Sequence, residues 1–320
     1  MQKVLVILGP TATGKTDLAL QLALKVKGEL VAADSRQVYR GLDVGTGKLP
    51  TDSTYEVRRM VPRRFNWKIG GINIWMYDVV SLDKQYTVAS YVKDANKVII
   101  DILKRHKLPI VIGGTGLYLK ALLSGLDNLS IPVDENLREE LGKLSLEQLQ
   151  DKLQSLSPDR WGQLSASDRA NSRRLLRSIE LVSMYPYKRS QKTVGLEKQF
   201  DILKIGLTAP RKALYKKSDL RVLSWFDEDI LKEVKGLVKN GVPLKRFGEF
   251  GLGYASLADY LDKKISEDNL VTVIQNRMHS YIRRQLTWFK KDHGIYWFDI
   301  TTENFTAQVE KLVSSWYDYG

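Results

Sequence analysis

The chain has 320 residues, with 50 lysines and arginines against 37 aspartates and glutamates, which gives a net charge of +13. It contains no cysteine and only three histidines, which excludes disulfides, thiol nucleophiles and cysteine- or histidine-rich metal sites. Hydrophobic residues make up 43% of the sequence, and no apolar run approaches the roughly 20 residues of a membrane span. Composition therefore predicts a soluble cytoplasmic protein, and the basic excess favours a polyanionic partner such as nucleic acid.

Short apolar runs alternate with amphipathic segments in the first third of the chain. Strands are expected at 4–8, 30–33 and 109–112, and helices at 15–27, 91–105 and from the glycines at 113–114 to 123. This alternation favours an α/β fold with a parallel sheet and right-handed crossovers. The segment 51–73 has no clear period, so we expect irregular structure or a β-hairpin there.

The middle of the chain has a different composition. It is rich in Leu, Glu, Gln, Ser and Arg without strand-like runs, so it is predicted to be helical. The strand pattern returns at 201–209, and amphipathic helices follow at 211–240 and 268–290. We therefore expect an α/β core formed by 1–126 and 196–320, interrupted by a helical insertion domain at 127–195. A monomer is expected.

A phosphate-binding motif lies between the first expected strand and helix. It fits the pattern G-x-x-x-x-G-K-[ST] and consists of Gly9, Pro10, Thr11, Ala12, Thr13, Gly14, Lys15 and Thr16. In such P-loop NTPase-like folds the backbone N–H groups surround a phosphate and the helix N-terminus adds positive potential. Lys15 contributes a charge, and the Thr16 hydroxyl is a candidate ligand for Mg²⁺.

The second expected strand ends in Asp34. Open α/β sheets bind their ligands at the carboxyl ends of the strands, so this carboxylate is expected beside the phosphate loop. Its residue type allows three roles: a metal ligand, a general base, or a carboxylate that caps a turn.

Five further runs match one known family in order and spacing. They are DSRQVYRGLDVGTGK at 34–48, GGTGLYLKALL at 113–123, RRLLRSIEL at 173–181, LYKKSDLRV at 214–222 and RRQLTWFKK at 283–291. With the phosphate loop, they make the chain closely resemble the bacterial tRNA dimethylallyltransferases. The resemblance implies transfer of a dimethylallyl group from dimethylallyl diphosphate to N6 of adenosine 37, in the tRNA anticodon loop.

The resemblance also assigns roles to residues. Asp34 matches the family's catalytic base, while Thr11, Lys15 and Arg221 match groups that stabilise the diphosphate. By resemblance the tRNA contacts are Asp34, Ser35, Arg36, Gln37, Thr115, Arg138, Arg174 and Arg177. Helical spacing adds Arg173, which shares a face with Arg177, and the second basic cluster with Arg284, Gln285 and Trp288 as further candidate tRNA contacts. The implied partners are the anticodon stem-loop of tRNA, contacted by the helical insert, and dimethylallyl diphosphate.

Several of these residues also have simpler explanations. The arginines at 173–177 fit a solvated basic helix face, Thr115 fits a helix N-cap, and Trp288 fits a core anchor flanked by apolar neighbours. The chain also departs from the family pattern at Trp75, Lys217, Ala255, Ser256 and His279. These departures affect expected RNA contacts and leave the chemical centre unchanged.

Three rival functions share parts of the pattern. A small-molecule kinase would use the same phosphate loop, and a prenyltransferase of free adenine nucleotides would use the same chemical centre. The high positive charge and the arginine-rich insert argue against both. A non-enzymatic RNA-binding module would leave Asp34 beside the phosphate loop unexplained.

Overall fold

The structure of the chain, a computed structural model, describes residues 1–50, 54–60, 66–129, 131–184 and 193–317. The chain forms two compact units: Met1–Ser124 with Gly195–Gly320, called the core unit below, and Gly125–Val194, called the insert. The insert is thus a continuous segment within the sequence of the core unit.

The core unit is built on a mixed sheet. Its strands are β1 (Lys3–Leu8), β2 (Glu29–Ala32), β3 (Val57–Met60), β4 (Asn66–Ile69), β5 (Ile72–Trp75), β6 (Pro109–Gly113), β7 (Asp201–Thr208) and β8 (Tyr296–Asp299). Within the described residues their order is β3-β4-β5-β2-β6-β1-β7-β8. Neighbours from β5 to β8 are parallel, whereas β3, β4 and β5 pair antiparallel. The expected parallel sheet is present, and of the two alternatives given for 51–73 the described residues there show antiparallel strands; 51–53 and 61–65 lie outside the described residues.

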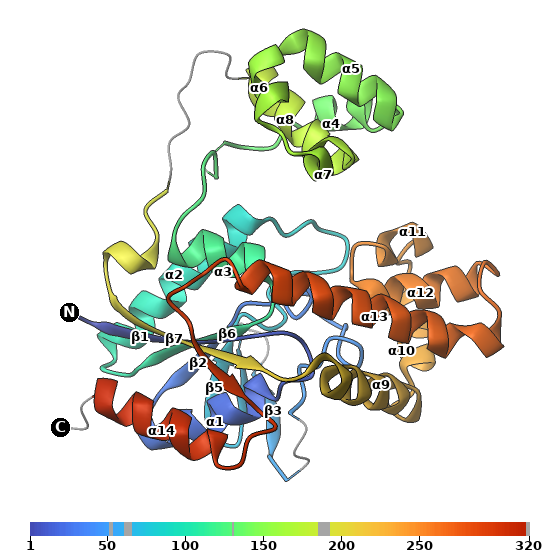
Figure 1. The fold of residues 1–320 in the computed structure, drawn as a ribbon. Coiled ribbons are helices and arrows are strands. Elements are labelled where there is room, and N and C mark those ends of the chain that lie inside the picture. The colour runs from blue at the N-terminus through green and yellow to red at the C-terminus, as the bar shows by residue number, and fades with distance from the viewer. Residues whose placement is uncertain (51–53, 61–65, 130, 185–192, 318–320) are drawn as a thin grey trace. The chain divides into compact units, whose positions relative to one another are not determined.

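Helices cover both faces of the sheet. The helices of the core unit are α1 (Lys15–Val26), α2 (Val88–Lys104), α3 (Gly116–Leu123), α9 (Arg211–Asp227), α10 (Ile230–Lys239), α11 (Leu244–Phe247), α12 (Leu252–Leu261), α13 (Glu267–Phe289) and α14 (Phe305–Trp316), with a short 3-10 helix η1 (Leu196–Lys198). In Figure 1, α2 and α3 lie on one side of the sheet, and α1 and α14 on the other. The central strand β1 is consequently buried on both faces, with Val4 to Leu8 at most 2% exposed.

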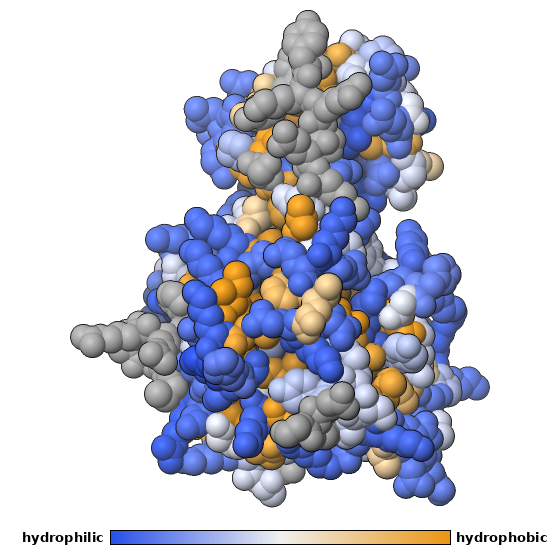
Figure 2. All heavy atoms as spheres, turned by 90° about the vertical axis from the view of Figure 1, so that its left-hand side faces the viewer, coloured by the Kyte–Doolittle hydropathy of each residue, from blue (hydrophilic) through white to orange (hydrophobic). Residues whose placement is uncertain are grey.

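The surface of the core unit contrasts with this interior. On the face drawn in Figure 2, hydrophilic residues cover most of the surface and hydrophobic residues appear in separate patches. In the described part of the chain, the helices are all too short or too polar to span a bilayer.

The insert has a small core of its own. It contains α4 (Glu135–Leu141), α5 (Leu146–Leu156), α6 (Pro158–Gln163), α7 (Ala166–Arg169) and α8 (Ser172–Met184). Leu149 and Leu153 on α5 pack with Leu175 and Ile179 on α8, one helical turn apart in each case. The middle of the chain is therefore helical, as its composition predicts.

One prediction about local structure was wrong, and one strand was not predicted. The helix expected at 211–240 is two helices, because the chain turns at Asp229, which adopts a left-handed conformation with φ of 61°. The edge strand β8 was not predicted, since its side chains are half-buried or exposed and lack an alternating apolar pattern. The helices α11, α12 and α14 were also not predicted from the sequence.

Candidate functional site

The phosphate loop connects β1 to α1, and its glycines meet specific backbone requirements. Gly9 has φ of 145°, and a Cβ there would lie 2.3 Å from the carbonyl oxygen of Leu207 on β7. Gly14 has φ of 72° at the N-cap of α1. A side chain at either position would strain the backbone or displace the neighbouring strand. The motif therefore has the strand–loop–helix setting that phosphate binding requires.

Two cations from different elements lie beside this loop. Lys15 begins α1 and donates to the carbonyl oxygen of Pro10 at 2.7 Å. Burial in the cavity wall, reinforced by the nearby Arg221, lowers the pKa of Lys15 to about 7, against the opposing effect of Asp34. Burial also lowers the pKa of Arg221, on α9. Both charged forms are therefore costly until an anion occupies the space between them.

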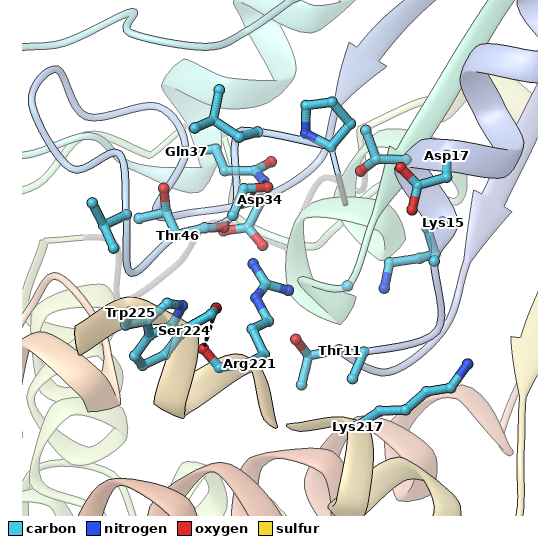
Figure 3. A pocket seen from close by; sticks show the side chains of 18 of the residues that line it. Thr11, Lys15, Asp17, Asp34, Gln37, Thr46, Lys217, Arg221, Ser224 and Trp225 are labelled. Atoms are coloured by element: carbon cyan, nitrogen blue, oxygen red, sulfur yellow. Dashed lines mark hydrogen bonds between the residues drawn. The ribbon is translucent and has the colours of Figure 1, made fainter. Parts of the chain in front are cut away.

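Asp34 lies two residues beyond the end of the buried strand β2 and faces the same space. Its Oδ1 accepts a hydrogen bond from the backbone N–H of Arg36 at 2.8 Å, so it does cap a turn. The carboxylate also lines the cavity. In Figure 3 the guanidinium of Arg221 extends from α9 toward Asp34, and Lys15 points into the same space. The turn cap thus holds the carboxylate in place without removing it from the site.

A second glycine-rich loop follows β6, next to the end of β2. A Cβ on Gly113 would lie 2.2 Å from the carbonyl oxygen of Ala33, so only glycine lets the two strand ends approach this closely. Thr115 occupies the N-cap position of α3, but its side chain does not cap that helix. Its Oγ1 instead accepts from the backbone N–H of Ser35 at 3.1 Å. This bond fixes the chain beside Asp34.

The cavity bounded by these elements has a volume of about 670 Å³. The predicted residues that line it are Thr11, Ala12, Gly14, Lys15, Thr16, Asp34, Gln37, Arg221 and Gln285. Lys217, one of the departures from the family pattern, also lines it. The structure thus brings together the phosphate loop, Asp34 and Arg221, which are far apart in the sequence.

Other predicted residues surround the cavity or hold its walls. Gln285 is 5% exposed; its side chain accepts from the N–H of Thr11 at 2.9 Å and donates to the carbonyl oxygen of Gly114 at 2.9 Å. It therefore joins the two glycine loops. Gln37 similarly donates to the carbonyl oxygens of Thr46 and Gly47. Their assignment as tRNA contacts stays a prediction.

Arg36, Arg284 and Trp288 lie outside the cavity lining. Arg36 donates to the carbonyl oxygen of Glu249, and the guanidinium of Arg284 lies 5.7 Å from the ring centroid of Tyr281. Trp288 is 38% exposed and so is not a buried core anchor, whereas its neighbour Phe289 is 3% exposed. An exposed indole remains available for contact with a partner.

The predicted arginines of the insert have two kinds of surroundings. Arg138 and Arg177 both pair with the fully buried Glu180, and these bonds, opposing its burial, keep the pKa of that carboxyl low. Arg174 pairs with Asp168 at 2.5 Å near the surface, and Arg173 is exposed. A structural role is therefore evident for Arg138 and Arg177, and their role in RNA binding stays a prediction.

The departures from the family pattern have partners within the core unit. Arg277 donates to Ser256 at 2.8 Å and to Asp259 at 3.0 Å, so a carboxylate one turn beyond Ser256 is available to this arginine. His279 Nε2 lies 2.7 Å from an Asp219 carboxylate oxygen. Trp75 donates to the buried Glu29 at 2.7 Å. Ala255 is half-buried on α12.

Tyr281 is a site residue that was not predicted from the sequence. It lies on α13 one turn before Gln285 and lines the cavity. Burial and the nearby Asp34 raise the pKa of its hydroxyl to about 12, so it remains a hydrogen-bond donor at neutral pH. The signal that identifies it is helical spacing, since residues four apart on one helix share a face.

The residues of the cavity fit a magnesium ion by the chemistry of their donors. The side chains of Thr16, Asp17 and Asp34 supply hydroxyl and carboxylate oxygens to one lining. Mg²⁺ is commonly held by one or two such groups together with phosphate oxygens of a substrate. A separate cluster of three or more His, Asp or Glu side chains that could hold a metal is absent from the described residues.

The chain is similar over most of its length to known prenyltransferases. A model of the IPP transferase family matches residues 37–292, and one of the isopentenyl transferase family matches residues 2–64. A tRNA dimethylallyltransferase of Bacillus mycoides is 34% identical over 98% of this chain and 94% of its own length. One of Bacillus anthracis is 33% identical over 98% and 95%.

Solved structures give the same result. The tRNA isopentenylpyrophosphate transferase of Bacillus halodurans has a TM-score of 0.69 at 27% identity, covering 98% of this chain and 96% of that one. A eukaryotic dimethylallyltransferase acting on tRNA has a TM-score of 0.76 at 23% identity, covering 100% of this chain and 79% of that one, and shares the fold.

Proposed function

This chain belongs to the IPP transferase family, and we propose that it transfers a dimethylallyl group from dimethylallyl diphosphate to N6 of adenosine 37 in the tRNA anticodon loop. The observation that carries this proposal is the meeting of three groups in one cavity: the phosphate loop, the Arg221 guanidinium and the Asp34 carboxylate. The phosphate loop and Arg221 supply donors for the departing diphosphate, and Asp34 supplies an acceptor for the proton of the adenine amino group.

The diphosphate end of the reaction requires stabilisation of a departing anion. The bond between C1 of the dimethylallyl group and the diphosphate oxygen breaks, and its electron pair leaves with the diphosphate. The loop N–H groups, Lys15 and Arg221 are fixed donors for that developing charge. Because burial makes both cations costly to charge, an anion in the cavity relieves that cost.

The adenine end requires removal of a proton. The lone pair of the N6 amino group is delocalised into the ring, so the amine is a weak nucleophile. N6 forms the new bond to C1 and loses one proton, for which Asp34 is the acceptor. Thr115 holds the chain beside Asp34 through Ser35. The base must leave the stacked loop to reach this carboxylate.

Mg²⁺ is part of the proposal. When bound, it would neutralise part of the negative charge on the diphosphate. Thr16 and Asp17 are the residues proposed to hold it, together with phosphate oxygens.

The RNA substrate is proposed from the named relatives and from the chain's charge. The relatives described above are named for tRNA, and the net charge of +13 suits a polyanion. We propose that the exposed Arg173, Arg174, Arg284 and Trp288 take part in this contact. We also propose that the protein acts as a cytoplasmic monomer, with its mass in solution by light scattering as the test.

One assay tests the function. The protein is incubated with Mg²⁺, dimethylallyl diphosphate and either unmodified tRNA or AMP, and the products are analysed by mass spectrometry. Prenylated tRNA without prenylated AMP is expected. Prenylated AMP alone would indicate a nucleotide prenyltransferase, and consumption of ATP without prenyl transfer would indicate a kinase.

A further inference from the structure

Lys48 is a fully buried cation with no role in the reaction described so far. Its side chain is 0% exposed, and its Nζ donates to the carbonyl oxygen of Tyr39 at 2.7 Å, to Asp43 at 3.0 Å and to Asp78 at 2.5 Å. All three donors of the ammonium group are therefore used. Enclosing a charge this completely is costly unless its partners are held in place.

The two carboxylates that face Lys48 are themselves fixed. Asp78 accepts from the indole N–H of Trp67 at 2.8 Å, and its backbone N–H donates to the carbonyl oxygen of Gln37 at 3.1 Å. Asp43 pairs with Arg59 at 2.6 Å. Lys48 thus ties the loop that runs from Asp43 to Lys48 to β4 and to the segment that contains Gln37.

The other end of this loop is held by two helices. Glu233 on α10 accepts from the backbone N–H groups of Asp43 and Val44 at 3.0 and 3.1 Å. Tyr254 on α12 donates to Glu233 at 2.6 Å, and its hydroxyl oxygen accepts from the N–H of Gly45 at 3.1 Å. The loop from Asp43 to Lys48 is consequently fixed at both ends.

Between these two attachments, the loop backbone lies directly against Arg221. A Cβ built on Gly47 would lie 1.4 Å from Nη2 of Arg221, and Gly47 has φ of 63°. The Gln37 amide donates to the carbonyl oxygens of Thr46 and Gly47 on the same stretch. The position of the Gly47 backbone therefore limits where the guanidinium can lie.

We propose that Lys48 is a positioning residue for the transfer reaction: its buried contacts with Asp43 and Asp78 hold the Gly47 backbone against Arg221 and so aim the guanidinium at the diphosphate. This inference rests on the proposed function. Lys48 touches no substrate and acts through Arg221. The loop thereby contributes to catalysis through the position of its backbone. The two adjacent residues have separate tasks: Gly47 leaves room for the guanidinium, and Lys48 fixes the loop.

The primary test is a double-mutant cycle with Lys48→Met and Arg221→Lys, measured as single-turnover rates of tRNA prenylation. Misplacing a group by about 1 Å costs on the order of 100-fold in rate, so Lys48→Met is expected to lower the single-turnover rate by about that factor. The apparent Kd for tRNA, from the concentration dependence of that rate, is expected to stay unchanged. If Lys48 acts through Arg221, the double variant is expected to be no slower than Arg221→Lys alone.

A second variant covers the case in which Lys48→Met does not fold. Gly47→Ala leaves the buried charges intact and places a methyl group where the guanidinium lies, so a similar rate loss is expected, again non-additive with Arg221→Lys. Glu29→Gln is the control for stability alone, because Glu29 is 1% exposed with charged partners at the opposite end of β2. It is expected to lower Tm without changing the single-turnover rate below its melting transition.

Two outcomes would overturn the inference. The first is a double variant whose loss in rate equals the product of the losses of Lys48→Met and Arg221→Lys. The second is a Lys48→Met or Gly47→Ala enzyme that has the wild-type rate. A wild-type protein that transfers no prenyl group to tRNA would instead refute the proposed function, so the two failures are distinguishable.

Discussion

The cavity of the core unit and the arginine cluster of the insert use half-buried cations in opposite ways. In the insert, Arg138 and Arg177 share the buried carboxylate of Glu180. In the cavity, Lys15 and Arg221 form no ion pair within the described residues, and burial lowers the pKa of both. Cations whose charge is already balanced stabilise the fold, whereas cations that lack a counter-ion are available to bind an anionic substrate.

The largest effect that tests this contrast is expected from Asp34→Asn. Without the base, single-turnover prenylation should fall by about 10²–10⁴-fold, while tRNA affinity in a filter-binding assay stays close to wild type. Loss of the negative charge should also lower the pKa of Lys15 further, since Asp34 is the group that raises it. A normal rate would remove Asp34 from the mechanism.

The next effect is expected from Lys15→Met. Loss of one fixed donor for a developing anion costs about 10²–10³-fold in rate. The single-turnover rate should fall by that factor, inhibition by inorganic diphosphate should weaken, and Tm should stay the same or rise. If inhibition by diphosphate is unchanged, the loop binds a different part of the substrate.

Arg177→Ala should give the converse result in the insert. The remaining contacts of Glu180 come from Arg138 and the backbone N–H of Asp134, so the variant should lose about 1–3 kcal/mol of unfolding free energy. Urea unfolding monitored by circular dichroism measures this loss. The matched control is Arg173→Ala, which removes an exposed arginine and should leave stability unchanged. Equal stability of the two variants would contradict the structural role of Arg177.

The smallest expected effect is a pH dependence of stability and of diphosphate affinity that comes from Lys15. Its pKa of about 7 lies below the ordinary value of 10.5, so between these values the unfolded chain holds a proton that the folded, free enzyme lacks. Stability is therefore highest, with respect to Lys15, above about 10.5; it is lost progressively as pH falls from there, and the loss is complete below about 7.

Diphosphate binding restores that proton, so affinity for inorganic diphosphate should fall by about tenfold per pH unit above 7. Calorimetry of wild type and Lys15→Met separates this effect from titration of the ligand itself. Equal pH slopes for the two proteins would show that Lys15 does not take up the proton.

The parts of the site that the sequence predicts are those encoded locally. The phosphate loop is one continuous motif between an expected strand and an expected helix, and Asp34 comes after the next expected strand. Chain order alone therefore places both at one edge of the sheet. The role of Arg221 is predicted only by the family resemblance, because the residue is far from the phosphate loop in the sequence and no local pattern marks it.

The loop at 43–48 could not be predicted because its partners are distant in the chain. Glu233 and Tyr254, which hold its first residues, lie about two hundred positions later. Lys48 ends the family-matching run at 34–48, but its burial between two carboxylates is visible only in the fold. Similarly, β8 is an edge strand whose formation depends on β7 being in place.

The attachment of the insert has a consequence for how this family can diversify. The chain leaves the core unit after Ser124 and re-enters it at Gly195, where a Cβ would lie 2.1 Å from the carbonyl oxygen of Leu123. The two ends of the insertion are thus adjacent within one small region of the core. A segment grafted at such a junction can be lengthened, exchanged or deleted without reordering the sheet. The insert can therefore vary in length and sequence while the sheet that carries Asp34 keeps its strand order.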